Sequence, residues 1–283
     1  MEFHVQCELD YTLNGPATFL FALKCIQTGG QKILREDLRV DPLIDTEEFK
    51  LEVGMNRFSR LEVFNPGNLK VAYQADVTTS TRIVPANTLN PNRPAGLNPE
   101  AIPFLFPSRY CQSDRLRQQA YDMFGHLHTP HELAAGISDW IHDHVTYVSG
   151  SSGETSSAIE TMEQRQGVCR DFAHLGIALC RSMCVPARYV ACYAHQLNPP
   201  DFHACFEVFI DGWWYIYDAT RLAPLNGLVR IATGRDAADA AVCTIFGSPR
   251  LDSSQVSCQC SDPNFTPVTR DTLAASGEVI AIL

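Results

Sequence analysis

The sequence predicts an α+β fold in which a helix that begins at a cysteine packs on an antiparallel sheet, with a small β-sandwich domain ahead of it. Three observations support this. Residues 3–11 alternate apolar and polar side chains, as a half-buried strand does. An apolar pattern at helical spacing follows Cys169. Asp211-Gly212 separates two strand-like runs, residues 203–210 and 213–219, which is a strong signal for a two-residue hairpin.

The N-terminal third contains further strand patterns. After the strand at 3–11, strand-like runs cover residues 17–26, 57–64 and 70–79, and the last two flank the turn sequence Asn65-Pro66-Gly67-Asn68. No helical periodicity interrupts these strands. We therefore expect residues 1–85 to form an antiparallel β-sandwich.

A proline-rich segment follows, with prolines at 85, 91, 94, 99, 103 and 107. This spacing excludes a continuous helix or a central strand. The run Ile102-Pro-Phe-Leu-Phe within it is apolar, and an exposed linker would rarely carry so much apolar surface. Residues 86–112 are therefore expected to lie as a strap over the next domain.

Residues 113–250 are expected to form the α+β core. A helix can start at Ser113 and run to about Gly125, and Thr129-Pro-His-Glu132 is a capping box for a helix that reaches about His144. A short helix at 157–165, the helix that begins at Cys169 and a strand at 187–195 precede the hairpin.

Beyond the hairpin the patterns are weaker. The alanine-rich run after Asp236 predicts a short helix or loop near the site, and Val242 to Phe246 predicts a final strand. Residues 251–283 are read as a polar tail, in which Glu278 to Leu283 can pair back onto the N-terminal domain.

Composition limits the classes of function. The chain has 283 residues with 22 basic and 32 acidic side chains, a net charge of −10, and no basic patch that could neutralise phosphates, so nucleic acid is not expected as a partner. Neither a signal peptide nor an apolar stretch of about 20 residues is present, so we expect a cytoplasmic protein without a membrane partner. The 11 scattered cysteines are expected to be mostly reduced and buried.

Three side chains at workable spacing suggest chemistry. Cys169 lies at a predicted helix N-terminus, where free N–H groups and the helix dipole favour a thiolate. His203 and Asp218 lie on the hairpin, whose turn places residue 210 opposite 213 and 205 opposite 218. The two are then diagonal neighbours on one face, roughly 7–8 Å apart at the backbone. Nucleophile, base and base-orienting carboxylate are the parts of an activated cysteine.

Four segments carry a family resemblance: Gly167-Val-Cys-Arg-Asp-Phe-Ala-His-Leu175, Val185-Pro-Ala-Arg-Tyr-Val190, the His203-Ala-x-x-Glu-Val pattern and the Trp214-x-x-x-Asp-Ala-Thr pattern. They resemble the transglutaminase-like superfamily, in particular its bacterial branch with an N-terminal β-rich region. The resemblance is strong from about Asp139 to Asp236 and looser elsewhere. It implies a papain-like/transglutaminase-like core with Cys169, His203 and Asp218 as catalytic residues. One departure is Cys205, where the family often has an aromatic residue.

Three further residues are candidates for supporting roles. The backbone N–H of Cys169 is the natural donor to a developing oxyanion, and the side-chain amide of Gln164 or Gln166 could supply a second donor. Either glutamine could equally be a solvated loop residue. Glu207 lies on the same predicted hairpin face as His203 and is a candidate partner in the shell around it.

No cofactor or metal is expected. His142 and His144 do not share a helix face, and the sequence has no His-Glu-x-x-His pattern and no paired Cys-x-x-Cys pattern. Cys258 and Cys260 have no second ligand pair nearby, and no calcium-binding loop is recognisable.

The sequence therefore favours a cysteine-dependent acyl-transfer enzyme that acts on a peptide or glutamine amide through a thioester. Water as acceptor would make it a peptidase or amidase, and an amine acceptor would make it a transglutaminase. The alternative from a different class is a non-catalytic binding module that keeps the fold. The expected partner is a peptide or protein substrate, with the N-terminal domain as a candidate recruiting surface; the oligomeric state is not indicated.

Overall fold

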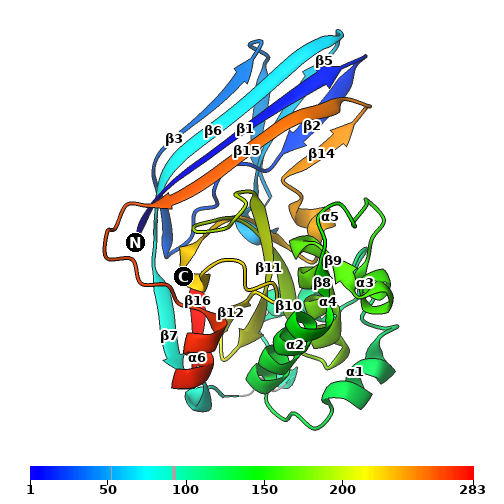
Figure 1. Ribbon diagram of the computed structural model, residues 1–283, viewed down its shortest axis with the longest axis vertical. Coiled ribbons are helices and arrows are strands. Elements are labelled where there is room, and N and C mark those ends of the chain that lie inside the picture. Colours follow the sequence, from blue (N-terminus) through cyan, green and yellow to red (C-terminus); the bar gives the residue numbers. More distant parts are fainter. Residues whose placement is uncertain (52, 91–93) are drawn as a thin grey trace.

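Two four-stranded antiparallel sheets form the sandwich in the upper half of Figure 1. The structure is a computed structural model and describes residues 1–51, 53–90 and 94–283. One sheet has the strand order β15-β1-β6-β3, with β1 Glu2–Leu13, β3 Gln31–Asp41, β6 Gly67–Thr79 and β15 Arg250–Cys260. The other has the order β14-β2-β5-β4, with β2 Ala17–Phe21, β4 Thr46–Lys50, β5 Arg57–Val63 and β14 Cys243–Phe246.

The alternation predicted for the first strand gives the sandwich its core. Every second residue of β1 from Phe3 to Leu13 is buried, and β6 contributes a matching row from Leu69 to Thr79. Aromatic rings from β1 and β2 close the core, with the ring centroids of Tyr11 and Phe19 5.1 Å apart. Burial of such rows on facing sheets is what stabilises a sandwich.

Some strand expectations need correction. The strand predicted over 17–26 ends at Phe21, because Ala22 and Ile26 donate backbone hydrogen bonds to Val242 and Arg230 outside the sheet partner β5. Strands β3 and β4 were not predicted, since their many charged residues hide the alternation.

The C-terminal part of the chain completes the sandwich. Val242 to Phe246 was expected to be the last strand of the core, but β14 pairs antiparallel with β2 instead. Residues 251–260 were read as polar tail, but β15 pairs with β1 along almost its whole length. The sandwich therefore depends on residues far beyond position 85.

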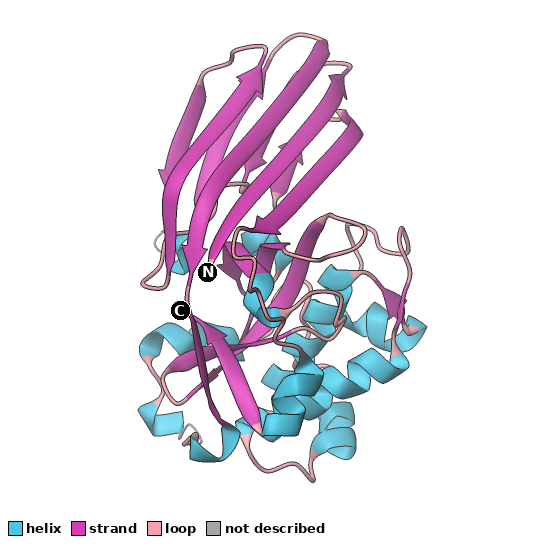
Figure 2. Ribbon diagram, turned by 60° about the vertical axis from the view of Figure 1, so that its left-hand side comes forward, coloured by secondary structure: helices cyan, strands magenta, loops and turns pink. Residues whose placement is uncertain are grey.

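The second half of the fold, which lies below the sandwich and holds the helices in Figure 2, is built on the antiparallel sheet β12-β11-β10-β13. Its strands are β10 Ala187–Ala194, β11 Phe202–Ile210, β12 Trp213–Tyr217 and β13 Leu228–Gly234. Helix α4, Cys169–Ser182, packs on β10 and β11, and α1 Arg117–Phe124, α2 Pro130–His144 and α3 Ala158–Gln164 pack around α4. This is the predicted α+β arrangement of a helix on an antiparallel sheet.

The helix boundaries mostly follow the sequence signals. The Thr129 capping box is present at the start of α2, and α3 and α4 lie where they were expected. Helix α1 begins at Arg117 rather than near Ser113. Residues 113–115 form turns instead of the first helical turn, and Ser113 is buried rather than capping the helix. No helix within the described residues is long and apolar enough to cross a membrane.

The opposite face of the central sheet is covered by a two-stranded sheet and a short helix. Strand β7, Thr81–Pro85, pairs antiparallel with β16, Glu278–Ile282, in a sheet that lies against β12 and is separate from the sandwich sheets. Helix α6, Arg270–Ser276, lies beside β16. A separate apolar cluster that includes Val190, Cys205 and Ile280 fills this layer.

The proline-rich segment packs as a strap of short 3-10 turns at Ala86–Thr88, Pro94–Gly96 and Pro99–Leu105. Phe104 is buried, and its ring lies edge-on to Trp214 at 5.2 Å. Ile102 and Phe106 remain partly exposed. Pro91 lies outside the described residues. Short two-residue strands, β8 Thr146–Tyr147 and β9 Gln166–Gly167, pair parallel just ahead of α4.

Candidate active site

The hairpin β11–β12 sets the position of the first two site residues. Asp211 and Gly212 both have positive φ, 50° and 82°, as the turn type favoured by Asp-Gly requires. Ile210 lies opposite Trp213 and Phe206 opposite Tyr217, which is the predicted register. His203 near the start of β11 and Asp218 just after β12 are thereby brought together.

The two side chains are joined by a hydrogen bond of 2.8 Å between His203 Nε2 and Asp218 Oδ2. The other carboxylate oxygen, Oδ1, accepts from the backbone N–H and the hydroxyl of Thr220, at 2.9 and 2.7 Å. Both side chains are almost fully buried, with exposures of 1% and 2%. Asp218 is therefore held by three hydrogen bonds in one orientation, and it fixes the plane of the imidazole.

Burial and charge shift the pKa values of His203 and Asp218 in opposite directions. Burial alone would raise the pKa of Asp218, but the charge and hydrogen bond of His203 and the two bonds from Thr220 bring it below its ordinary value. Burial would lower the pKa of His203, but the Asp218 charge, its hydrogen bond and the neighbouring Cys169 raise it well above 6.5. The charge and hydrogen bond of Asp218 therefore favour the imidazolium form of His203.

Cys169 is the first residue of α4 and is half-buried. Its side chain is a hydrogen-bonding partner of His203. Because Asp218 occupies Nε2, Nδ1 is the ring nitrogen left for the sulfur. The helix start is fixed by Asp171, whose Oδ2 accepts from the backbone N–H of Val168 at 2.9 Å. The helix N-terminus adds its positive dipole to the imidazolium beside the sulfur.

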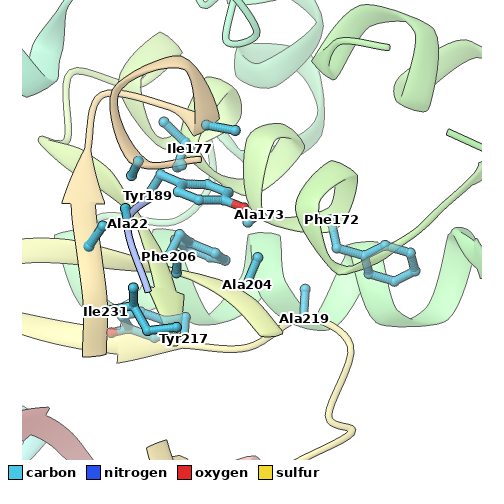
Figure 3. Packing of buried hydrophobic residues seen from close by; sticks show 14 of the residues in the cluster. Ala22, Phe172, Ala173, Ile177, Tyr189, Ala204, Phe206, Tyr217, Ala219 and Ile231 are labelled. Atoms are coloured by element: carbon cyan, nitrogen blue, oxygen red, sulfur yellow. The ribbon is translucent and has the colours of Figure 1, made fainter. Parts of the chain in front are cut away.

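Close contact between helix and sheet places the cysteine beside the histidine. A Cβ on Gly176 of α4 would lie 2.6 Å from the Phe206 ring of β11, so only glycine permits this approach. Figure 3 shows Tyr189 and Phe206 packed between Ala173 and Ile177 of α4 on one side and Ile231 of β13 on the other. The distance between α4 and β11 therefore depends on this packing.

Cys169 and His203 open into a pocket of about 580 Å³ at the junction of sandwich and core. Its lining combines a few polar groups with a wall of small apolar residues. The other lining residues are Tyr110, Glu154, Arg170, Tyr189, Ala191, Phe202, Ala204, Ala237, Ala238, Ala240, Ala241, Val242, Cys243, Thr244 and Ile245. The alanine-rich run after Asp236 forms α5, Ala237–Ala240, and lies in the pocket wall as the sequence suggested.

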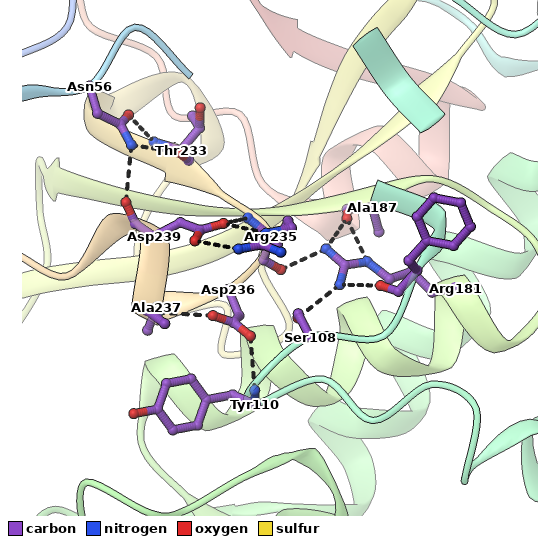
Figure 4. A network of polar contacts seen from close by, with 12 residues as sticks. Asn56, Ser108, Tyr110, Arg181, Ala187, Thr233, Arg235, Asp236, Ala237 and Asp239 are labelled. Atoms are coloured by element: carbon purple, nitrogen blue, oxygen red, sulfur yellow. Dashed lines mark hydrogen bonds and ion pairs between the residues drawn. The ribbon is translucent and has the colours of Figure 1, made fainter. Parts of the chain in front are cut away.

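A polar network fixes this wall (Figure 4). Asp236 accepts from the backbone N–H groups of Tyr110 and Ala238, at 2.8 and 2.9 Å. Asn56, from the sandwich, donates to the carbonyls of Thr233 and Asp239 and accepts from the N–H of Thr233. The segment that leads from β13 to β14 is thus attached to both halves of the molecule.

The supporting residues proposed from sequence lie elsewhere. Gln164, at the end of α3, and Gln166, in β9, are exposed, and neither belongs to the pocket lining. Glu207 is fully buried, and its carboxylate pairs with Arg188 at 2.5 Å and Arg230 at 3.2 Å rather than with His203. Cys205, which stands where the family often has an aromatic residue, packs in the apolar layer behind the sheet, away from the pocket.

Tyr147 was missed by the sequence analysis. The parallel pairing of Tyr147 with Gly167 brings it beside α4, and its ring lies 6.0 Å from that of Phe172. The backbone N–H of Cys169 donates to its hydroxyl, and burial together with the nearby Cys169 raises the pKa of Tyr147. A two-residue parallel bridge has no recognisable sequence pattern. Among the described residues, no group of three or more His, Cys, Asp or Glu side chains is arranged to hold a metal ion.

Comparisons with known proteins agree with this fold. The sequence model of the Transglutaminase-like superfamily matches residues 117–219, and that of the Bacterial transglutaminase, N-terminal domain, matches residues 1–94. A solved structure from Cytophaga hutchinsonii, of a protein proposed to be a cysteine protease, is 45% identical with a TM-score of 0.96. The match covers 100% of this chain and 98% of that one.

Two curated relatives are uncharacterized mycobacterial proteins. One from Mycobacterium leprae is 32% identical over 123 residues, which are 40% of this chain and 44% of that protein. One from Mycobacterium tuberculosis is 33% identical over 88 residues, 31% of this chain and 28% of that protein. The matches thus span less than half of these relatives. With both family models and the C. hutchinsonii structure taken together, the chain belongs to the transglutaminase-like superfamily.

Proposed function

We propose that this protein is a cysteine-dependent acyl-transfer enzyme that acts on the amide of a peptide or of a glutamine side chain. The observation that carries the proposal is the buried, hydrogen-bonded His203–Asp218 pair next to the half-buried sulfur of Cys169, in a pocket that Cys169 and His203 line. A positively charged ring beside a cysteine at a helix N-terminus favours the thiolate, which is the reactive form.

In the first step, the Cys169 thiolate attacks the amide carbonyl carbon and forms a carbon–sulfur bond. The tetrahedral intermediate collapses, the carbon–nitrogen bond breaks, and His203 transfers its proton to the leaving amine. The products are a thioester on Cys169 and a free amine or ammonia. Asp218 keeps the imidazole in the orientation that both proton transfers need.

In the second step, neutral His203 takes a proton from the acceptor, which attacks the thioester carbonyl and releases the Cys169 thiolate. Water as acceptor gives a carboxylic acid, and a primary amine gives a new amide. We favour water as the acceptor, because no binding site for an amine is recognisable in the sequence.

The negative charge that develops on the carbonyl oxygen needs hydrogen-bond donors. The backbone N–H of Cys169 supplies one. The Tyr147 hydroxyl currently accepts from that N–H, so a substrate oxygen would displace it, and the displaced hydroxyl would then be free to donate to the same oxygen. Tyr147 would thereby take the role for which Gln164 and Gln166 were candidates from the sequence.

The proposal is tested by incubating the protein with a mixed peptide library and with casein, with and without a primary amine such as monodansylcadaverine. New peptide termini, or conversion of glutamine to glutamate, support hydrolysis, and dansyl incorporation supports transamidation. Cys169→Ala should abolish either reaction, whereas Cys184→Ala, which removes an exposed cysteine, should not. If Cys169→Ala and wild type give the same product profile, the enzyme hypothesis is wrong and the binding-module alternative replaces it.

A further inference from the structure

Strand β14 is an edge strand of the sandwich and also a wall of the active-site pocket. It occupies one end of the sheet order β14-β2-β5-β4, so its second edge is not paired within the sheet. Cys243, Thr244 and Ile245 line the same pocket as Cys169 and His203. An unpaired strand edge presents backbone donors and acceptors that can pair with another extended chain.

The pairing with β2 identifies which groups are free. The backbone N–H of Ala22 donates to the Val242 carbonyl at 2.9 Å, and the same register continues into β14. Hydrogen-bonded and non-hydrogen-bonded pairs alternate in an antiparallel ladder. Thr244 is therefore bonded to β2, while Cys243 and Ile245 direct their N–H and C=O groups away from β2.

The side chains of the same two residues do not cover this edge. Cys243 lies within hydrogen-bonding reach of Tyr11, and Ile245 packs against the sandwich core. What β14 offers to the pocket is therefore mainly backbone. The neighbouring wall is made of Ala237, Ala238, Ala240 and Ala241, whose side chains form no hydrogen bonds.

Charge also distinguishes β14 from the other edges. Of the four edge strands of the two sandwich sheets, all within the described residues, it is the only one without a charged side chain. The opposite edge of its own sheet, β4, carries Glu47, Glu48 and Lys50. Charged residues on edges prevent pairing with other chains, so the uncharged edge next to Cys169 lacks that protection.

We propose that β14 is the substrate-docking edge: an extended segment of an acyl-donor polypeptide adds to it as a further strand and so lies beside Cys169. This inference rests on the proposed function and specifies its substrate class as unfolded or extended polypeptide rather than a small free amide. A peptide backbone that enters an alanine-lined pocket needs hydrogen-bond partners, and Cys243 and Ile245 supply them.

The test uses three reagents that alkylate cysteine: iodoacetamide, acetyl-Ala-Ala-Ala-chloromethyl ketone and bromoacetyl-Ala-Ala-Ala-amide. The two peptide reagents extend in opposite directions from the reactive carbon. Ile245→Pro removes the N–H that points away from β2, a change that edge strands tolerate. It should lower the rate constant of Cys169 modification about threefold to tenfold for one peptide reagent, as expected for the loss of one hydrogen bond. The rate with iodoacetamide should not change.

Ile245→Ala, which shortens the side chain but keeps the N–H, is the matched variant, and the affected peptide reagent should lose clearly less reactivity with it than with Ile245→Pro. A second measurement uses wild-type protein and versions of the affected reagent that are N-methylated at one alanine at a time. If the reagent adds as a strand, only alternate alanines direct their N–H groups toward β14. N-methylation should then lower the rate of Cys169 modification at every second alanine and leave it unchanged at the others. This series decides the matter even if Ile245→Pro does not fold.

Two negative outcomes are distinguishable. In the first, Cys169 reacts normally with iodoacetamide, and neither Ile245→Pro nor any N-methylation lowers its rate of modification by the peptide reagents. This result would overturn docking on β14 and leave the proposed function standing. If Cys169 reacts with iodoacetamide no faster than the exposed Cys184, the proposed function fails, and the docking proposal falls with it.

Discussion

His203 and Asp218, fifteen residues apart in the chain, share a buried hydrogen bond of 2.8 Å across the β11–β12 hairpin. The bond lies just beyond the last paired residues of β12, so the hairpin register determines whether it can form. A slip of one residue would turn one of the two side chains to the other face of the sheet. The chemistry proposed for Cys169 therefore depends on a two-residue turn at the far end of the hairpin.

Asp218→Asn should change how the free energy of unfolding varies with pH, because it removes the charge that pairs with His203. The folded pKa of Asp218 is lowered, so its contribution is present above the ordinary value of 3.8 and is lost as pH falls through the folded pKa. The folded pKa of His203 is raised, so its contribution is present below 6.5 and is lost as pH rises through the folded pKa.

Wild type should therefore exceed Asp218→Asn by about 3 kcal/mol in free energy of unfolding between these two ordinary values, and by less at either extreme. Urea unfolding at pH 3, 5.5 and 9 measures this difference. Asp114→Asn, at an exposed position, is the control and should show no such profile. A difference that stays constant with pH would contradict the ion pair.

Glu207→Gln should lower stability without affecting Cys169. Glu207 is the buried acid between Arg188 and Arg230, so the neutral amide removes the charge that pairs with the buried Arg230 and the half-buried Arg188. We expect a loss of about 3–5 kcal/mol in free energy of unfolding and an unchanged rate of Cys169 alkylation. Glu163→Gln, on the exposed side of α3, should change neither. Loss of Cys169 reactivity at full stability would instead make Glu207 a partner of His203.

Gly176→Ala should separate α4 from the sheet. Its Cβ would lie 2.6 Å from the Phe206 ring, so helix or ring must move, at a cost of about 1–3 kcal/mol. Because Cys169 begins the same helix, its rate of alkylation should fall as well. Gly153→Ala, whose Cβ meets nothing within 4 Å, is the control. Thermal unfolding and alkylation that match wild type would mean that this close approach does not position the cysteine.

Tyr147→Phe tests the second oxyanion donor. If the hydroxyl donates to the developing oxyanion, kcat for amide turnover should fall about tenfold or more, with KM little changed and alkylation of Cys169 unaffected. If the hydroxyl only occupies the place of the substrate oxygen, its removal should raise turnover instead. Steady-state kinetics on any substrate found by the library screen separates the two results.

Local signals in the sequence were sufficient for the parts of the molecule that hold Cys169, His203 and Asp218. The Asp211-Gly212 turn, with both residues at positive φ, predicted the register that joins His203 to Asp218. The helical pattern after Cys169 predicted α4, and the Thr129 capping box predicted the start of α2. Each of these signals lies within a stretch of about fifteen consecutive residues.

The features that the sequence analysis missed depend on contacts between distant segments. Strand β15 pairs with β1 across some 240 residues of chain, and neither strand carries a signal for its partner. Glu207 lies an even number of residues from His203, so strand alternation places both on one face. Only the folded structure shows that Glu207 pairs with two arginines, from β10 and β13. Tyr147 reaches Cys169 through a two-residue bridge that no periodicity reveals.

The central claim is that His203 activates Cys169, and the pH dependence of alkylation by iodoacetamide tests it most directly. Wild type and His203→Ala are compared, the modified residue is identified by peptide mass mapping, and the exposed Cys184 serves as the internal reference. We predict that Cys169 reacts rapidly well below the free-thiol pKa of about 8.5 and that His203→Ala abolishes this reactivity. Slow modification in both proteins, with the profile of an ordinary thiol, would contradict the account.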